Sequence, residues 1–337
     1  MIESKISEKQ WEEFFNGDRL ACARIISIVD NYPELVPDVL NRLQTKGRHA
    51  VRIGITGPPG VGKSTFTSTI AEHASSNGLR IGIIAVDPSS PFTGGAFLGD
   101  RVRMQNLVGN PNVFIRSLAS RSGGGLSLST PYVADVFDAY GMDLILIETV
   151  GVGQAELDVI LYCDLIMLVL QPSTGDAIQM LKAGIMEIAD LFIINKSDLP
   201  GADLLFEYIQ FILETGSTYK EGDKPPVLKA SAIQGLGIEQ VFTALQNRIQ
   251  TLKQSGRLTE KRKDRIFREI EKSVKQHIWQ KFLSLNDIER RIHQAAENFE
   301  KTGRSPFNFI KKLYSSLEVS FKNEFCCDSN MTEDEKG

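Results

Sequence analysis

The sequence predicts an α/β protein with a doubly wound, mostly parallel sheet, because short apolar runs alternate with segments long enough for helices. The runs lie between residues 51 and 231 and read VRIGIT, LRIGIIAV, NVFIRSL, MDLILIE, DLIMLVLQ, DLFIIN and PVLKAS. Several are apolar at nearly every position, which is typical of strands covered by helices on both faces. The intervals leave room for crossover helices, so we expect parallel strands.

Helical extensions flank this region on both sides. Residues 7–45 have a helical apolar period around a break at NYPEL, which predicts a small helical hairpin. After residue 250 the strands cease, and helices are expected in a basic segment at 257–282, at 286–301 and at 306–323. The predicted organisation is an N-terminal helical extension (1–46), an α/β domain (47–250), a C-terminal helical dimerisation region (251–323) and a disordered tail (324–337).

The basic segment leaves three interpretations open. Its apolar side chains recur every four residues, at Ile266, Ile270, Val274, Ile278 and Phe282. Exposed on a single helix, such a row usually marks an interface, here that of a homodimer, although neighbours within the chain could also cover it. Binding to nucleic acid is the third interpretation, but regularly spaced aromatic residues for base stacking are lacking.

Composition argues against several classes of protein. The 337 residues are 42% hydrophobic and 24% charged, and the net charge of -4 gives no reason to expect a nucleic-acid or anionic-membrane partner. Four scattered cysteines form no disulfide framework and suit the reducing cytosol. The N-terminus resembles neither a secretory signal nor a transit peptide, and no run is long enough to span a bilayer. We therefore expect a cytoplasmic protein.

A glycine-rich segment follows the first apolar run directly. The stretch GPPGVGKS fits the pattern GxxxxGK[ST], in which backbone N–H groups converge on phosphates and the next helix adds its positive end. Lys63 is expected to reach the β and γ phosphates, and Ser64 to bind Mg²⁺. The pattern predicts a P-loop NTPase, with nucleotide contacts from Gly57, Pro58, Pro59, Gly60, Val61, Gly62, Lys63, Ser64 and Thr65.

Polar side chains follow most of the other apolar runs. Ligands of open α/β sheets bind along the edge where the strands end. The residues expected at that edge are Asp87, Glu148, Asn195, Lys196 and Ser231. Asp87 also has a simpler interpretation as a turn residue before Pro88.

The motif NKSD at 195–198 predicts which base is bound. The Asp198 carboxylate can accept hydrogen bonds from N1–H and N2–H₂ of guanine, whereas adenine offers a lone pair at N1. A site built on such a pair rejects the other base strongly. Lys196 would cover one face of the base, and a backbone N–H near Ala232, after Ser231, would meet O6. The expected ligands are GTP and GDP.

Acidic residues around a Gly-rich loop predict the Mg²⁺ site. Asp87 and Asp100 bracket this loop, and hard oxygen ligands on such a loop suit a cation that bridges phosphates. We interpret it as a switch region that becomes ordered around the triphosphate. Glu148 stands where many GTPases have the Asp of DxxG, and the N–H of Gly151 is expected to meet the γ-phosphate.

A family resemblance rests on five stretches: GPPGVGKSTF, VDPSSPFTGGAFLGDRVRM, IETVGVGQAE, QPSTGDAIQMLKAGIMEIAD and NKSDLPGAD. Over residues 17–250 the chain resembles the MeaB/ArgK group of GTPases, chaperones associated with adenosylcobalamin-dependent methylmalonyl-CoA mutase. The resemblance implies a homodimer whose GTPase cycle gates cobalamin delivery to, or protection of, a partner acyl-CoA mutase. It also implies a Mg²⁺ set of Ser64, Asp87, Asp100 and Glu148. SRSGGGLS at 120–127 is about one residue shorter than the RGxxGG form of the family, so Arg121 receives no role.

The resemblance further implies how hydrolysis is controlled. GDAIQMLKAG matches a segment that reports the nucleotide state to the partner, through Asp176, Gln179 and Lys182. The catalytic set is Lys63, Asp87, Asp100 and Glu148. Val152 stands where Ras-like enzymes carry a water-orienting glutamine, so turnover is expected to be slow until a partner completes the site. Gln154 could orient the water or merely cap a turn.

Two alternative functions are considered for this chain. A nickel-inserting GTPase shares the predicted fold, but this chain has four histidines and no His-rich tract. An ATP-dependent kinase of amino-acid transport is the other alternative, and the NKSD motif argues against ATP.

Overall fold

The computed structural model describes residues 5–43, 50–88, 104–120, 127, 129–149, 161–172, 188–215, 224–284, 288–302 and 309–311. The chain divides into two compact units, residues 1–269 and 270–337. Within the described residues, no helix combines the length and the apolar character that crossing a bilayer requires.

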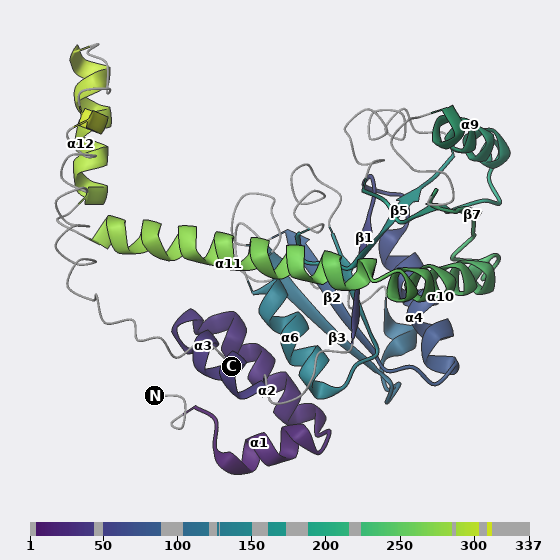
Figure 1. Ribbon diagram of the computed structural model, residues 1–337, viewed down its shortest axis with the longest axis horizontal. Coiled ribbons are helices and arrows are strands. Elements are labelled where there is room, and N and C mark those ends of the chain that lie inside the picture. The colour runs from purple at the N-terminus through teal and green to yellow at the C-terminus, as the bar shows by residue number, and fades with distance from the viewer. Residues whose placement is uncertain are drawn as a thin grey trace. The chain divides into compact units, whose positions relative to one another are not determined.

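A seven-stranded sheet forms the centre of the first unit (Figure 1). Its strands are β1 (Val51–Thr56), β2 (Ile81–Pro88), β3 (Val113–Ser120), β4 (Leu144–Glu148), β5 (Leu165–Leu170), β6 (Leu191–Ile194) and β7 (Val227–Lys229). All paired strands are parallel, in the order β3-β2-β4-β1-β5-β6-β7. Each strand falls within or close to a run identified in the sequence, so the predicted doubly wound sheet is confirmed.

The strand order reverses beside β1. From β1 the chain crosses to β2 and β3, returns to β4 beside β1, and continues with β5 on the other side of β1. Ligands of open parallel sheets bind where the strand order reverses in this way. The segment that leaves β1 therefore lies where a ligand is expected.

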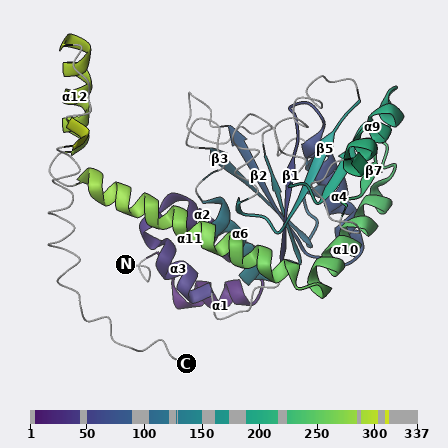
Figure 2. The ribbon, with the colours of Figure 1, turned by 45° about the horizontal axis from the view of Figure 1, so that its top comes forward.

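Two helices cover one face of the sheet, α4 (Lys63–Ser76) and α10 (Ile238–Gln254). Along β5, Leu165, Met167 and Val169 point to this face, and their neighbours point to the other, as the period of a strand requires. Apolar side chains of α4 and α10, including Phe66 and Phe242, complete this core. Figure 2 shows these helices on the side of the sheet opposite α6.

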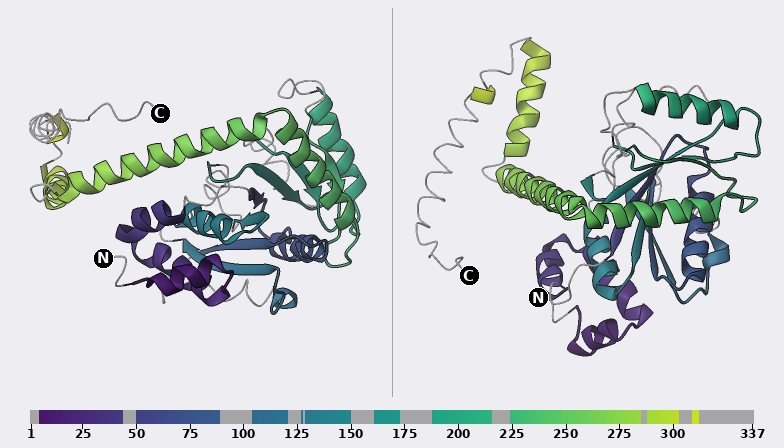
Figure 3. Two further views of the ribbon diagram at one scale, coloured as in Figure 1. Left: turned by 60° about the horizontal axis from the view of Figure 1, so that its bottom comes forward. Right: turned by 45° about the vertical axis from the view of Figure 1, so that its right-hand side comes forward.

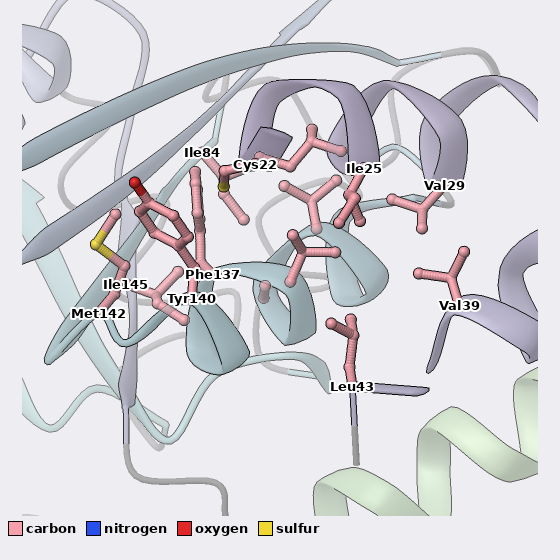
Figure 4. Close-up of a cluster of buried hydrophobic side chains, with 14 of the residues drawn as sticks. Cys22, Ile25, Val29, Val39, Leu43, Ile84, Phe137, Tyr140, Met142 and Ile145 are labelled. Carbon is pink, nitrogen blue, oxygen red and sulfur yellow. The ribbon is translucent and has the colours of Figure 1, made fainter. Parts of the chain in front are cut away.

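The other face carries α6 (Thr130–Tyr140) and the N-terminal helices α1 (Glu8–Phe15), α2 (Arg19–Asn31) and α3 (Val36–Leu43), with the short η2 (Pro33–Leu35) between the last two. Figure 4 shows Cys22 and Ile25 of α2 directed toward Phe137 of α6. The Tyr140 hydroxyl donates to Gly17 O at 2.5 Å. The N-terminal helices are therefore part of the sheet's core, and burial raises the pKa of the Cys22 thiol.

The predicted helical hairpin contains one helix more than expected. Ser7 caps α1 reciprocally with Gln10, and Asp18 caps α2 by accepting from the Ala21 N–H at 2.7 Å. The left-handed Gly17 separates the two helices. The apolar period continues across this break, which is why periodicity alone did not reveal it.

Helix α9 (Ala202–Thr215) covers β5, β6 and β7 near the end of the sheet. Its buried residues Ala202, Ile209 and Leu213 pack on Leu168, Leu170, Phe192 and Ile194. Figure 3 shows α9 at the sheet edge distant from the N-terminal helices. A short η3 (Gln105–Leu107) precedes β3 on the chain.

Buried carboxylates join the strands at the amino-terminal edge of the sheet. Asp164, just before β5, accepts from the backbone N–H of Arg52 at 3.0 Å, and Asp190, just before β6, accepts from that of Ile166 at 3.0 Å. The Arg52 guanidinium pairs with Asp135 of α6 at 2.6 Å. Burial opposes the charge on Arg52, but the surrounding carboxylates, led by Asp135, outweigh this effect and raise its pKa.

The same carboxylates anchor the first half of α11 (Arg257–Ser284), whose residues up to 269 belong to the first unit. Lys261 pairs with Asp190 at 2.7 Å, and Arg265 approaches Asp164 at 3.4 Å. Arg262 donates to Ala50 O at 2.9 Å. A buried ion cluster therefore fastens the start of α11 to the sheet.

The second unit contains the end of α11, helix α12 (Ile288–Thr302) and a helical stretch at 309–311. Phe282 and Ile288 are buried within it. The expected helix at 286–301 is confirmed, whereas the predicted tail at 324–337 lies outside the described residues. The predicted boundary at residue 250 falls within α10, and the division into functional domains stays a prediction.

We predict that Asp164→Asn lowers the free energy of unfolding by about 3 kcal/mol, because it removes one carboxylate that neutralises buried arginines. Urea unfolding followed by circular dichroism measures the change. The matched control is Asp203→Asn, which removes an exposed pair with Lys229 and should cost less than about 1 kcal/mol. Equal losses in the two variants would contradict a special role for the buried cluster.

Candidate nucleotide-binding site

The glycine-rich loop connects β1 to α4 at the carboxyl-terminal edge of the sheet. Gly57 has a φ of 149°, and a Cβ there would lie 2.0 Å from Val169 O on β5. Gly62 is left-handed, with a φ of 90°, and forms the N-cap of α4. Only glycine satisfies both the conformation and the close approach at these positions. The loop therefore leads directly into the positive end of a helix, as a phosphate site requires.

Lys63 lies within this loop. Its ammonium donates to Gly57 O at 2.7 Å and to Pro58 O at 2.9 Å, and the residue is buried. A buried cation that faces backbone carbonyls beside a helix N-terminus is suited to attract an anion. The predicted phosphate contact is therefore consistent with where Lys63 lies.

Ser64 and Glu148 meet beside the loop. The Ser64 hydroxyl donates to Glu148 Oε1 at 2.6 Å, and both residues are buried. Strand register explains the contact, because Glu148 at the end of β4 is paired with Ile55 of β1, just before the loop. A hydroxyl and a carboxylate oxygen are ligands that suit Mg²⁺. These two residues therefore fit the predicted metal site.

The other predicted metal and switch residues have less described structure. Asp87 lies near the end of β2, two residues beyond Ala85, which is paired with Glu148. Among the described residues, no three His, Cys, Asp or Glu side chains cluster as metal ligands. Seven residues named in the sequence analysis lie outside the described residues: Asp100, Arg121, Gly151, Gln154, Asp176, Gln179 and Lys182. The roles expected of them stay predictions.

Asn195 joins the phosphate loop to the segment expected to meet the base. Its amide Nδ2 donates to Val61 O at 2.8 Å, and its Oδ1 accepts from the Ala232 N–H at 3.0 Å. The residue is buried at the end of β6, so both hydrogen bonds are shielded from water. Loops that follow β1, β6 and β7 are thereby held in one arrangement.

Lys196 and Asp198 follow Asn195 at the carboxyl-terminal edge of the sheet. Lys196 has a positive φ of 57°, and its ammonium donates to Gly60 O at 2.8 Å. The Ser197 N–H donates to Ala230 O at 3.0 Å, and the exposed Asp198 follows. Lys196 therefore lies along the loop and Asp198 is accessible, as a residue that recognises a base must be.

The loop after β7 that contains Ser231 and Ala232, the base-side loop, was predicted to supply an N–H to guanine O6. The Ala232 N–H donates to Asn195, so a neighbouring N–H of this loop would have to meet guanine O6. Ser231 forms an isolated bridge with Leu236, and Thr69 of α4 donates to Ala232 O at 3.1 Å. The loop is thus fixed from both Asn195 and α4.

Several of these contacts were not evident in the sequence. Asn195, Lys196 and Ser64 each contact residues far away along the chain, and only the strand register brings them together. Asn106, which follows the predicted switch region on the chain, accepts from Ser68 of α4 at 2.7 Å. The motifs identified the residue types, but no spacing in the sequence indicated these pairings.

The family model described as methylmalonyl-CoA mutase-associated GTPase MeaB matches residues 22–287. A relative from Pyrococcus abyssi is 45% identical over 266 residues, covering 78% of this chain and 82% of its own length. The GTPase ArgK of Escherichia coli is 31% identical over 316 residues, covering 90% and 95%. The mitochondrial methylmalonic aciduria type A homolog of Caenorhabditis elegans is 32% identical over 320 residues, covering 88% and 78%.

A solved structure supports the fold. The crystal structure of a LAO/AO transport system kinase aligns with a TM-score of 0.70 at 24% identity, covering 92% of this chain and 97% of that one. At this identity the likeness concerns the fold alone.

We predict that Lys63→Ala weakens GTP binding by at least about 100-fold, because an ammonium close to phosphate forms charge-assisted hydrogen bonds. The melting temperature of the ligand-free protein should fall by only a few degrees, from loss of the two carbonyl contacts. Calorimetric titration and thermal unfolding measure both, with the exposed Lys253→Ala as control. Unchanged affinity, or a variant that no longer folds, would contradict the assignment.

We predict that Asp198→Asn shifts preference from GTP toward XTP, because an amide can pair with the 2-oxo group of xanthine. Competition binding with the two nucleotides gives the ratio of affinities. Asp203→Asn serves as a control for the loss of one nearby surface charge. If the variant binds GTP as tightly as the wild type does, Asp198 does not contact the base.

Proposed function

The chain belongs to the MeaB family of GTPases, and we propose that its GTPase cycle gates adenosylcobalamin delivery to, or protection of, an acyl-CoA mutase. Methylmalonyl-CoA mutase is the partner in our proposal, because the family description names it. Membership of the family agrees with the prediction of a GTP-hydrolysing enzyme. The likeness to the LAO/AO transport system kinase concerns the fold alone, so it does not favour the kinase alternative.

The observation that carries the nucleotide assignment is the double hydrogen bond of Asn195. By contacting Val61 and Ala232 together, its amide sets the distance between the phosphate loop and the base-side loop. Asp198 follows three residues later, on the segment that Asn195 joins to the phosphate loop. A base that leaves this carboxylate without its two donors is disfavoured, which supports guanine over adenine.

The predicted catalytic and metal-binding residues would act together on the phosphates and Mg²⁺. Lys63 would neutralise charge on the β and γ phosphates, and Ser64 with Glu148 would hold Mg²⁺ together with Asp87 and Asp100. The metal would supply positive charge to the phosphate oxygens when bound. Glu148 already accepts a hydrogen bond from Ser64, which supports this pairing. The Gly151 N–H would report the presence of the γ-phosphate.

Hydrolysis by the isolated protein should be slow. The position after Gly151 is Val152, which has no polar group to orient a water molecule. A positioned glutamine or a supplied arginine accounts for large rate effects in other GTPases, about 10³ to 10⁵ for the arginine. We propose that the mutase completes the site, acting through the segment that contains Asp176, Gln179 and Lys182.

A homodimer is also part of the proposal. Ile270, Val274 and Ile278 of α11 are among the exposed large apolar residues of the chain. A row of this kind is unusual on a surface that remains in water, and it supports an interface.

We predict that Lys182→Ala leaves GTP affinity and basal hydrolysis within about twofold of wild type but reduces acceleration by the mutase. A partner shifts a switch only through contacts that differ between its states. Single-turnover hydrolysis with and without methylmalonyl-CoA mutase gives the acceleration, and Lys224→Ala is the control. Equal acceleration of the variant and the wild type would exclude this segment from the coupling.

We predict that Ile270→Glu combined with Val274→Glu and Ile278→Glu converts a dimer into a monomer that still binds GTP. Substitution is preferable to truncation after residue 250, because truncation would remove Lys261, Arg262 and Arg265 from the buried cluster. Sedimentation velocity gives the mass, and Leu20→Glu with Val108→Glu is the control at exposed apolar residues outside α11. A variant that remains dimeric would refute this interface.

A further inference from the structure

The hydroxyl of Thr69 on α4 forms a hydrogen bond that reaches outside its own helix. It lies 2.9 Å from Thr65 O and 3.1 Å from Ala232 O, so its one proton is shared between two carbonyl oxygens. The bond to Thr65, four residues earlier, is one that threonine commonly forms within a helix. The bond to Ala232 joins α4 to the base-side loop instead. This second bond does not hold the helix together, so its effect falls on the loop.

Ala232 is held through both of its backbone polar groups. Its N–H donates to Asn195 Oδ1 at 3.0 Å, and its C=O accepts from Thr69 at 3.1 Å. Asn195 and Ala232 are both buried, so the two bonds have little competition from water. Contacts from the end of β6 and from α4 therefore limit rotation of the backbone on each side of Ala232.

The peptide group that follows Ala232 points its N–H away from α4. The Ala232–Ile233 peptide is trans, and in a trans peptide the C=O and the N–H point in opposite directions. Since Ala232 O faces Thr69, the Ile233 N–H faces the other way. Ile233 is 82% exposed, and its N–H donates to no acceptor within the described part of the chain. A backbone donor in this position can meet an oxygen atom of a ligand.

Most other N–H groups of the base-side loop are already used. Three of them donate to carbonyl oxygens of the loop itself, at distances of 2.9 to 3.2 Å: those of Ser231, Gln234 and Leu236. The N–H of Ala232 is bound by Asn195. Of the remaining two, Ile233 and Gly235, only Ile233 adjoins the residue that Asn195 and Thr69 both hold. Its N–H is therefore the best-oriented donor for guanine O6.

We propose that Thr69 is a positioning residue for guanine recognition, because its hydrogen bond to Ala232 O directs the Ile233 N–H to the O6 atom of the base. The inference rests on the guanine site proposed above. It adds the donor that O6 meets and the side chain that orients this donor. Thr69 lies in the second turn of α4, about 7.5 Å along the axis from Ser64 in the first turn. One helix would thus support both the phosphate contacts and the O6 contact.

Three variants test the role of the Thr69 hydroxyl. Thr69→Val keeps the branched shape and removes the hydroxyl, whereas Thr69→Ser keeps the hydroxyl and should behave as wild type. The matched control is Thr251→Val on α10, because the Thr251 hydroxyl donates to the carbonyl four residues earlier, Asn247 O, at 2.9 Å. This control removes the same kind of bond within a helix and leaves the base-side loop unchanged. Circular dichroism and thermal unfolding verify that each variant folds.

Two analogues of GDP separate the O6 contact from the contact with Asp198. In 6-thio-GDP a sulfur atom, which is a weaker acceptor, replaces O6, while N1–H and N2–H₂ remain. IDP keeps O6 and lacks the 2-amino group. We expect Thr69→Val to reduce the preference for GDP over 6-thio-GDP by about threefold or more, since the O6 bond is weakened. Its preference for GDP over IDP should stay within about twofold of wild type, and Thr69→Ser and Thr251→Val should keep both preferences.

Competition binding with the three nucleotides gives these ratios, and amide hydrogen exchange by NMR locates the donor. GDP should slow exchange of the Ile233 N–H in wild type. Unchanged preference for GDP over 6-thio-GDP in Thr69→Val would overturn the role of Thr69, as would an equal fall of both preferences. Exchange of the Ile233 N–H that GDP does not slow would exclude it as the donor. In each of these cases the guanine site stands, whereas a wild type that binds ADP as tightly as GDP would overturn the site itself.

Discussion

The side-chain amide of Asn195 is the interaction on which the nucleotide-binding edge depends. It uses a donor and an acceptor at once, toward Val61 on the phosphate loop and Ala232 on the base-side loop. Buried polar groups are costly when they lose a partner, so both loops are favoured in the positions that satisfy the amide. The parallel register of β1, β5, β6 and β7 brings these loops within reach of one side chain.

Buried carboxylates at the amino-terminal edge of the sheet hold the start of α11. Asp164 and Asp190 accept backbone N–H groups at the start of neighbouring strands and also pair with cations of α11. Breaking such buried pairs is expensive, which keeps the start of α11 fixed to the sheet. The candidate nucleotide site therefore lies at the carboxyl-terminal edge of the sheet. The ion pairs that hold the start of α11 lie at the amino-terminal edge.

The sequence predicted the strands and the site motifs well, because both are local signals. β5 and β6 are apolar at every position, and the glycines of the phosphate loop adopt conformations that few other residues can. The pairings that join the motifs could not be predicted in the same way. Ser64 with Glu148, or Arg262 with Ala50, are contacts between distant segments that depend on strand order and register. The break at Gly17 was hidden because the apolar period runs through it.

Guanine recognition is the central claim, and competition among nucleoside diphosphates tests it most directly. A fluorescent GDP analogue bound with Mg²⁺ would be displaced by unlabelled GDP, by IDP, which lacks the 2-amino group, and by ADP. We predict that IDP binds about tenfold or more weakly than GDP, since Asp198 loses one donor, and that ADP binds at least about 10³-fold more weakly. Displacement by ADP at the same concentration as GDP would contradict a guanine site built on Asn195 and Asp198.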